Sequence, residues 1–320
     1  MKRFLKRFWF PILFVLFFGP FLIPVNSSGT QTKEQAAETL WGNESKWIEI
    51  ADHQVHYVTA GDPMSDNLII LMHGFGASAF SYKQILEPLS KVGFVVAYDR
   101  AAFGFTERPT TWSLNPYGFE GQMAVLDGMV TNFGEGKNVY VVGHSAGGSL
   151  AASYAVANQS KLTGLVLFAP AVLTTGGSPE WLNFILSLPP INHVGPLLVA
   201  PIATNGLDIL YDSYFNPNNV TQETLDGYTA PLKINGWERA FWEFNLAPRD
   251  TSIKDRITEI RIPILVITGD TDRIVPTADS IQVSKMIPGS ELVVIPRAGH
   301  LANEERPSEF SQALIEFITP

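Results

Sequence analysis

Six short apolar runs recur along this chain, and they constrain its fold more than any other feature. Each run is four or five residues long and almost entirely apolar. A strand formed by such a run has two apolar faces, and helices must cover both of them. The pattern therefore predicts an α/β fold with a doubly wound, mostly parallel sheet. The six runs are Leu68–Met72, Phe94–Tyr98, Val139–Val142, Leu165–Phe168, Ile264–Thr268 and Leu292–Ile295.

The segment before these runs predicts a β-hairpin. Trp47–Ile50 and Val55–Thr59 are rich in apolar residues and flank a turn-forming tripeptide, Ala51-Asp52-His53. Between the later runs, the spacing of apolar side chains favours helices. The expected helices are Phe80–Lys91, Tyr117–Asn132, Gly148–Ala157, Ala278–Met286 and Ser308–Ile318.

One interval breaks this alternation. About 95 residues separate Phe168 from Ile264, whereas a crossover between parallel strands needs only about a dozen. We therefore expect an inserted subdomain in this interval. Its aromatic side chains can form a small core of their own or line an apolar pocket. They include Trp181, Phe184, Tyr211, Tyr214, Phe215, Trp237, Phe241, Trp242 and Phe244.

The first 25 residues differ in composition from the rest. A basic stretch, Lys2–Arg7, precedes an uncharged run from Phe8 to Val25, which is typical of a membrane-targeting segment. As a helix, this run would span roughly 27 Å, just short of a hydrocarbon core of about 30 Å. We expect residues 1–25 to be an uncleaved anchor that contacts the membrane through residues 8–25, with the folded domain on the outer, non-cytoplasmic side. The alternative is a cleaved signal segment and a secreted protein. Residues 26–46 are rich in Ser, Thr, Gln, Glu and Ala, and they predict a linker.

The overall composition limits the partners of the chain. A formal net charge of −9 argues against nucleic acid as a partner. The absence of cysteine excludes disulfides and thiolate metal sites. The partners that we expect are the membrane and, from the catalytic motifs described next, a small-molecule apolar ester.

A glycine-flanked serine follows the third apolar run. Gly143-His144-Ser145-Ala146-Gly147 directly follows Val139–Val142 and precedes a stretch compatible with a helix. This strand–turn–helix context is that of a nucleophile elbow, a sharp turn that lifts a serine above the sheet. Glycines suit positions 143 and 147 because a side chain at either would press against neighbouring backbone. The pentapeptide alone would arise by chance in about one such sequence in seven, so its context carries the prediction that Ser145 is a nucleophile.

A serine hydroxyl needs a base to take its proton and an acid to orient that base. Asp270 and Asp272 follow the penultimate run, and His300 follows the last. All of them come just past the carboxyl end of a predicted parallel strand, where open α/β sheets assemble their sites. Asp272 lies deeper in its loop and is the better candidate, although periodicity leaves Asp270 open. His144 is expected to point away from the serine and to pack or hydrogen-bond beneath the turn.

The oxyanion formed when a serine attacks a carbonyl needs hydrogen-bond donors that are already in place. The Ala146 N–H, at the start of the expected helix, is one such donor. The run Leu68–Met72 ends in His73-Gly74-Phe75-Gly76, a turn that can present the Phe75 N–H to the same oxygen. We expect Phe75 and Ala146 to be the two donors and His73 to hold the loop. This chemistry requires no metal and no cofactor.

In order along residues 47–318, these motifs resemble those of the capped α/β-hydrolase family. The resemblance implies a core at 47–170 and 256–320, a mainly helical cap at 171–255, and Ser145, Asp272 and His300 as the triad. The matching segments are His73–Gly76, Tyr98–Arg100 with Phe103-Gly104, Gly143–Gly148, Gly269–Pro276 and His300.

The motifs and the resemblance lead to one main functional expectation. We expect a serine hydrolase that cleaves carboxylic esters of apolar substrates through an acyl-enzyme. A carbon–carbon bond hydrolase and a thioesterase of the same fold are alternatives. The carbon–carbon hydrolases of this family usually carry Asn before the serine, where this chain has His144. A catalytically inactive, membrane-tethered binding protein is a further alternative, but such relatives usually lose a triad residue.

Overall fold

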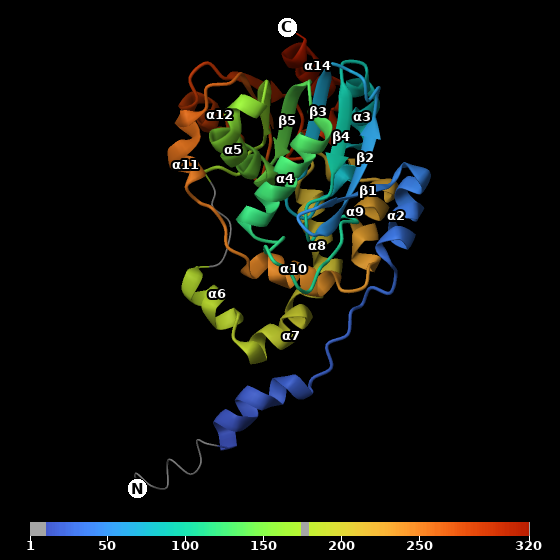
Figure 1. The fold of residues 1–320 in the computed structure, drawn as a ribbon, viewed down its shortest axis with the longest axis vertical. Helices are drawn as coiled ribbons and strands as arrows, with labels where there is room; N and C mark the ends of the chain where they lie inside the picture. Colours follow the sequence, from blue (N-terminus) through green and yellow to red (C-terminus); the bar gives the residue numbers. More distant parts are fainter. Residues whose placement is uncertain (1–10, 174–178, 320) are drawn as a thin grey trace.

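A mixed eight-stranded sheet forms the centre of the chain. A computed structural model describes residues 11–173 and 179–319, and within them the strand order is β1-β2-β4-β3-β5-β6-β7-β8 (Figure 1). Every pair from β4 to β8 is parallel, whereas β2 pairs antiparallel with both β1 and β4. All eight expected strands are present, with ends shifted by at most two residues. They are β1 Lys46–Ile50, β2 His53–Ala60, β3 Asn67–Met72, β4 Phe94–Tyr98, β5 Asn138–His144, β6 Gly164–Phe168, β7 Ile264–Gly269 and β8 Glu291–Ile295.

Helices cover both faces of this sheet, as the two-sided apolar strands require. Side chains alternate along each strand: Ile69 and Leu71 of β3 join one core cluster, and Leu68 and Ile70 join the other. The first cluster lies under α3 and α14, and the second lies under α4, α5 and α12. These helices are α3 Lys83–Ser90, α4 Phe119–Phe133, α5 Ala146–Asn158, α12 Thr277–Met286 and α14 Pro307–Ile318.

Residues 26–46, expected to form a linker, instead contain helix α2 (Lys33–Trp41). The Thr32 side chain accepts from the Gln35 N–H while the Gln35 side chain accepts from the Thr32 N–H, which is a capping box. Ala36, Ala37 and Trp41 are buried in the first core cluster. Some of the polar residues that suggested a linker therefore cap a helix. The small alanine side chains let that helix pack closely against the core.

Five of the α-helices between β6 and β7 together form what we call the helical insertion. They lie beyond the carboxyl edge of the sheet (Figure 1), and the chain returns to the sheet at α11 (Ile253–Arg256). Its aromatic residues divide into two groups: Trp237, Phe241, Trp242 and Phe244 are buried, whereas Trp181 and Phe184 are 65% and 69% exposed. The five helices are α6 Glu180–Leu186, α7 Pro189–Val199, α8 Ile202–Asp212, α9 Gln222–Thr229 and α10 Trp237–Leu246.

The amino-terminal segment forms a short apolar helix, Pro11–Leu22, at the end of the molecule opposite the carboxyl terminus (Figure 1). The expected membrane segment also includes residues 1–10, which lie outside the described residues. In the part of the chain that is described, no single helix has the length and apolarity to cross a membrane. One pair, α7 with α8, passes that test by length and composition together but is bent by 58°.

Two neighbouring glutamates of helix α13 (Ala302–Glu305) join the insertion to the core. The hydroxyls of Tyr214 and Tyr228 each donate to the Glu304 carboxylate at 2.6 Å. Glu305 accepts from the backbone N–H of Phe215 at 2.8 Å and from that of Gly299 at 2.7 Å. The insertion is thus held against the loop that carries His300.

Burial makes the Glu304 junction sensitive to pH. Burial raises the pKa of Glu304 from 4.5 to about 7, although the two tyrosine hydroxyls lower it. Between these two values the folded chain holds a proton that the unfolded chain has released. The free energy of unfolding therefore falls as pH rises through this window, by up to about 1.4 kcal/mol per pH unit.

We predict that Glu304→Gln, which does not titrate, removes this component. The melting temperature of the variant minus that of the parent should be higher at pH 8 than at pH 5, measured by differential scanning calorimetry. A difference that is the same at both pH values would contradict a raised pKa for Glu304.

Candidate active site

Ser145 lies at the junction of β5 and α5 in a strained backbone conformation. Its φ is 52° and its ψ is −121°, in a region that residues with a side chain rarely adopt. The neighbouring chain is very close: a Cβ at Gly143 would lie 2.7 Å from Ala151 Cβ, and one at Gly147 would lie 2.5 Å from His73 O. The glycines are therefore required by contact with neighbouring atoms. The result is a sharp turn that brings Ser145 to the wall of a cavity.

The structure brings Asp272 and His300 together from the loops after β7 and β8. His300 Nδ1–H donates to Asp272 Oδ2 at 2.7 Å, and both side chains are buried. Asp272 Oδ1 accepts from the backbone N–H groups of Ile274 and Val275, each at 2.9 Å. These bonds fix the carboxylate and leave the other ring nitrogen of His300, Nε2, available for a proton from a serine.

Asp270, the other candidate acid, is placed differently. Its side chain is exposed, and its Oδ1 accepts from the Ala298 N–H and from the hydroxyl of Thr271. Of the two carboxylates, Asp272 is the one that His300 contacts.

His144 packs beneath the turn, in agreement with the sequence-based expectation. Its Nε2 lies 3.1 Å from the His300 carbonyl oxygen, so Nε2 carries the proton and donates. Its ring stacks on Phe168 at 4.3 Å and lies 4.5 Å from the His300 ring. Burial lowers the pKa of His144 well below its ordinary value, so this ring stays neutral. His144, the residue next to Ser145 in the chain, thus supports the backbone of His300 through this hydrogen bond.

The loop after β3 approaches the serine very closely. A Cβ at Gly74 would lie 2.9 Å from Ser145 Cβ, so no larger residue fits there without movement. His73 Nδ1–H donates to Gly74 O at 2.7 Å, and burial lowers the pKa of His73 to about 4, which keeps it neutral. Among the described residues, the amides of Phe75 and Ala146 donate to no protein acceptor. Phe75 and Ala146, whose N–H groups are free of protein acceptors, thus line the same cavity as Ser145.

Arg100 has a role that sequence reasoning missed. Its backbone N–H donates to His73 Nε2 at 2.9 Å, and its Nη1 donates to His73 O at 3.2 Å. Burial lowers its pKa to about 10, so it remains charged at neutral pH. Arg100 therefore holds the loop of Phe75 from below. Arg100 comes directly after β4, at the carboxyl edge of the sheet, and this position is the sequence signal that could have indicated its role.

Two cavities meet at the Phe75 side chain. The larger, of about 570 Å³, includes Ser145 and Ala146 in its wall, and the smaller, of about 150 Å³, includes His144 and His300. Helix α10 of the insertion contributes Phe244 to the larger cavity and Phe241 to the smaller. In the described part of the chain, no group of three or more His, Asp or Glu side chains is placed to hold a metal ion.

A family comparison agrees with this geometry. A sequence profile described as alpha/beta hydrolase fold matches residues 67–307, which is most of the chain. The chain belongs to the α/β-hydrolase fold family. The matched range includes the β3 loop, the Ser145 turn, Asp272 and His300.

Known hydrolases are similar to this chain over most of its length. It is 27% identical over 277 residues to the 2-hydroxy-6-oxo-2,4-heptadienoate hydrolase of Pseudomonas putida, with 82% of this chain and 91% of that protein covered. It is 23% identical over 282 residues to the monoacylglycerol lipase ABHD6 of Homo sapiens, with 87% of this chain and 82% of the lipase covered. The crystal structure of a bacterial membrane phospholipase A has the same fold, with a TM-score of 0.65, 18% identity, and 99% of this chain and 98% of that chain covered. The family and these relatives support a hydrolase.

The bonds around the two aspartates lead to a paired prediction. We expect Asp272→Asn to lower kcat for an ester by about 10³–10⁴-fold, because the amide cannot hold the tautomer of His300 that accepts a proton. The matched variant, Asp270→Asn, should change kcat little. Steady-state hydrolysis of an aryl ester measures both. A larger loss from Asp270→Asn would contradict the arrangement.

Proposed function

We propose that this α/β-hydrolase cleaves carboxylic esters of apolar substrates through an acyl-enzyme on Ser145. The observation that carries the proposal is the pair of free amides, Phe75 N–H and Ala146 N–H, beside a serine that shares its strand edge with the Asp272–His300 pair. An ester carbonyl oxygen that becomes negatively charged would find both donors already in place.

In the proposed reaction, Ser145 Oγ attacks the ester carbonyl carbon while His300 Nε2 takes the hydroxyl proton. Phe75 and Ala146 stabilise the oxyanion of the tetrahedral intermediate. The carbon–oxygen bond to the alcohol then breaks, and His300 returns the proton to the departing alcohol. A water molecule attacks the acyl-enzyme in the same way, with His300 as base, and releases the acid and the free serine.

The walls of the larger cavity favour an apolar substrate. Most of its lining side chains near Ser145 are aliphatic or aromatic, and a volume of about 570 Å³ accommodates a medium-sized group. The similarity to a monoacylglycerol lipase supports an ester with an apolar acyl chain. The apolar lining includes Leu150, Val172, Phe244, Ile253, Ile274 and Val275.

A second candidate, a carbon–carbon bond hydrolase, is favoured by one specific observation. Arg100 and Arg249 also line the larger cavity, where they could meet a carboxylate. The Pseudomonas putida relative acts on a compound that is itself a carboxylate by name. The ester proposal takes precedence because the apolar side chains outnumber the cations and because His144 stands where the carbon–carbon hydrolases of the family usually have Asn.

We also propose that the amino-terminal segment anchors the protein in a membrane, with the catalytic domain on the outer side. Helix Pro11–Leu22 has no charged residue, and the basic stretch Lys2–Arg7 precedes it, as the positive-inside rule requires. The alternative is that this segment is cleaved and the domain is secreted. The mass of the protein isolated from its host distinguishes the cleaved chain from the full chain.

A substrate series tests the proposed activity. We expect kcat/KM for aryl esters to rise as the acyl chain lengthens from acetyl to octanoyl, because longer chains bury more apolar surface in the cavity. Ser145→Ala should abolish turnover, whereas Ser149→Ala, which removes a hydroxyl that donates to Ala171 O, should retain most of it.

The same series distinguishes the second candidate. Faster turnover of a carboxylate-bearing dienone than of any ester would favour carbon–carbon cleavage. Residual ester turnover in Ser145→Ala equal to that of the parent would contradict a serine nucleophile altogether.

A further inference from the structure

The first two helices of the insertion carry a surface that is unusual for a globular domain. Large apolar side chains on α6 and α7 are exposed to solvent, two of them by more than 60% of their area on α6 alone. Contiguous exposed apolar patches of this kind commonly mark interaction sites. We call this surface the α6–α7 face, which consists of Trp181, Phe184, Ile185, Leu188, Leu197 and Leu198.

The α6–α7 face is exposed although α7 keeps its core-packing side turned toward the rest of the protein. The side of α7 opposite Leu197 and Leu198 is already packed: Pro196 and Val199 are buried, and a Cβ at Gly195 would lie 2.1 Å from the ring of Trp242 on α10. Among the described residues, α7 packs against α10 and, at His193, against the amino-terminal segment, while its Leu197 and Leu198 stay exposed. Large apolar side chains that remain exposed beside a packed helix commonly mark an interaction surface.

Polar contacts fix the orientation of α7. Arg239 on α10 donates through Nη1 to Asn192 O at 2.9 Å and through Nη2 to His193 O at 3.1 Å. Trp242 Nε1–H donates to Asn192 Oδ1 at 2.8 Å. These bonds hold the buried side of α7 toward α10, with Leu197 and Leu198 exposed.

Charge is also missing from this part of the sequence. From Trp181 to Leu207, 27 consecutive residues include no Asp, Glu, Lys or Arg. A surface that faces only water would carry charged side chains over such a length. Contact with an aqueous protein partner also commonly involves a charged or polar rim.

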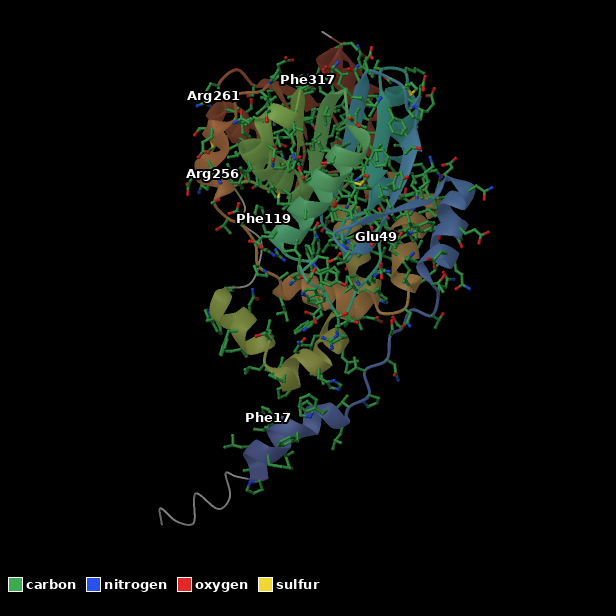
Figure 2. The ribbon with its side chains drawn as sticks, in the orientation of Figure 1. Phe17, Glu49, Phe119, Arg256, Arg261 and Phe317 are labelled. Carbon is green, nitrogen blue, oxygen red and sulfur yellow. The ribbon has the colours of Figure 1, made fainter. Side chains whose placement is uncertain are left out.

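The α6–α7 face is continuous with the amino-terminal helix. Phe21 lies 5.4 Å from the ring of His193 on α7, and His193 Nε2–H donates to Ile23 O at 3.1 Å. Figure 1 shows helix Pro11–Leu22 at the same end of the molecule as α6 and α7, and Figure 2 shows its apolar side chains around Phe17 standing free of the folded domain. Two uncharged surfaces thus share one end of the molecule.

We propose that the α6–α7 face is a second membrane-contacting surface, which lies in the interfacial layer of the bilayer that holds the amino-terminal helix. Trp181 suits this layer, since its ring has an apolar body and one polar N–H group. The bilayer is the occupant because the face adjoins an apolar segment of membrane-targeting composition and carries no charge that a protein partner would pair. The inference rests on the membrane anchor proposed above, and it does not depend on which bond the enzyme cleaves.

The absence of cysteine from the chain makes a direct test possible. Phe184→Cys in the full chain places one environment-sensitive fluorophore, such as a nitrobenzoxadiazole, on the face. Met64→Cys is the matched control, because Met64 is 84% exposed and lies before β3, at the opposite edge of the sheet. Both labelled proteins are reconstituted with vesicles of phosphatidylcholine and phosphatidylglycerol, with and without lipids that carry a nitroxide on the acyl chain.

We expect both variants to sediment with the vesicles. The emission of the probe at position 184 should shift to the blue and be strongly quenched by the nitroxide lipids, while the probe at position 64 changes in neither respect. Sedimentation with a water-exposed probe at position 184 would overturn the second surface and leave the anchor standing. A blue shift that grows with protein concentration and is not quenched by lipid would place a second copy of the chain on the face and also overturn it. Failure of both variants to sediment would overturn the anchor and the second surface together.

Discussion

The close packing of the Ser145 turn against the loop after β3 is the constraint on which the rest of the site depends. The turn holds Ser145 at a φ of 52°, a strained value that persists only where surrounding structure enforces it. Gly147 touches the backbone of the β3 loop, and Gly74 of that loop touches Ser145 in return. This mutual contact brings the β3 loop and the Ser145 turn together, and Phe75, Ser145 and Ala146 line the same cavity. The parallel sheet beneath supplies the rigidity, because β3 and β5 are direct neighbours.

A second set of contacts ties the helical insertion to the loop that carries His300, the proposed base. Glu305 bonds the amide of Gly299, next to His300, and also the amide of Phe215 in the insertion. Glu304 bonds two tyrosines of the insertion from the same short helix. A movement of the insertion would therefore act on the loop that positions His300. The same insertion provides walls for both cavities and carries the α6–α7 face on its outer side, so the cavity at Ser145 and the proposed membrane contact lie beyond the same edge of the sheet.

Much of this structure could be predicted from sequence, because the strongest signals are local. The strands were predictable since each run is apolar on both faces, and the order of Ser145, Asp272 and His300 follows from where those strands end. The choice between Asp270 and Asp272 was not decided by periodicity, because it depends on the Ile274 and Val275 amides that turn toward only one carboxylate.

Other features depend on tertiary contacts that no local pattern reveals. Helix α2 was expected to be a linker, because capping residues and linker residues have similar composition. The aromatics of the insertion were expected to form a small core or to line an apolar pocket, but Trp181 and Phe184 on α6 are exposed, which only the packing of the insertion helices determines. The support that Arg100 gives to the Phe75 loop likewise required the position of β4 beside β3.

The central claim is that Ser145 carries the acyl group during turnover. Rapid acid quenching of the enzyme while it hydrolyses an activated aryl ester, followed by mass spectrometry of its peptides, measures this directly. We expect the peptide containing Ser145 to gain the mass of the acyl group and to lose it when the substrate is exhausted. Two results would contradict a serine nucleophile. In the first, product forms in a burst while Ser145 stays unmodified throughout turnover. In the second, the acyl group is found on another residue.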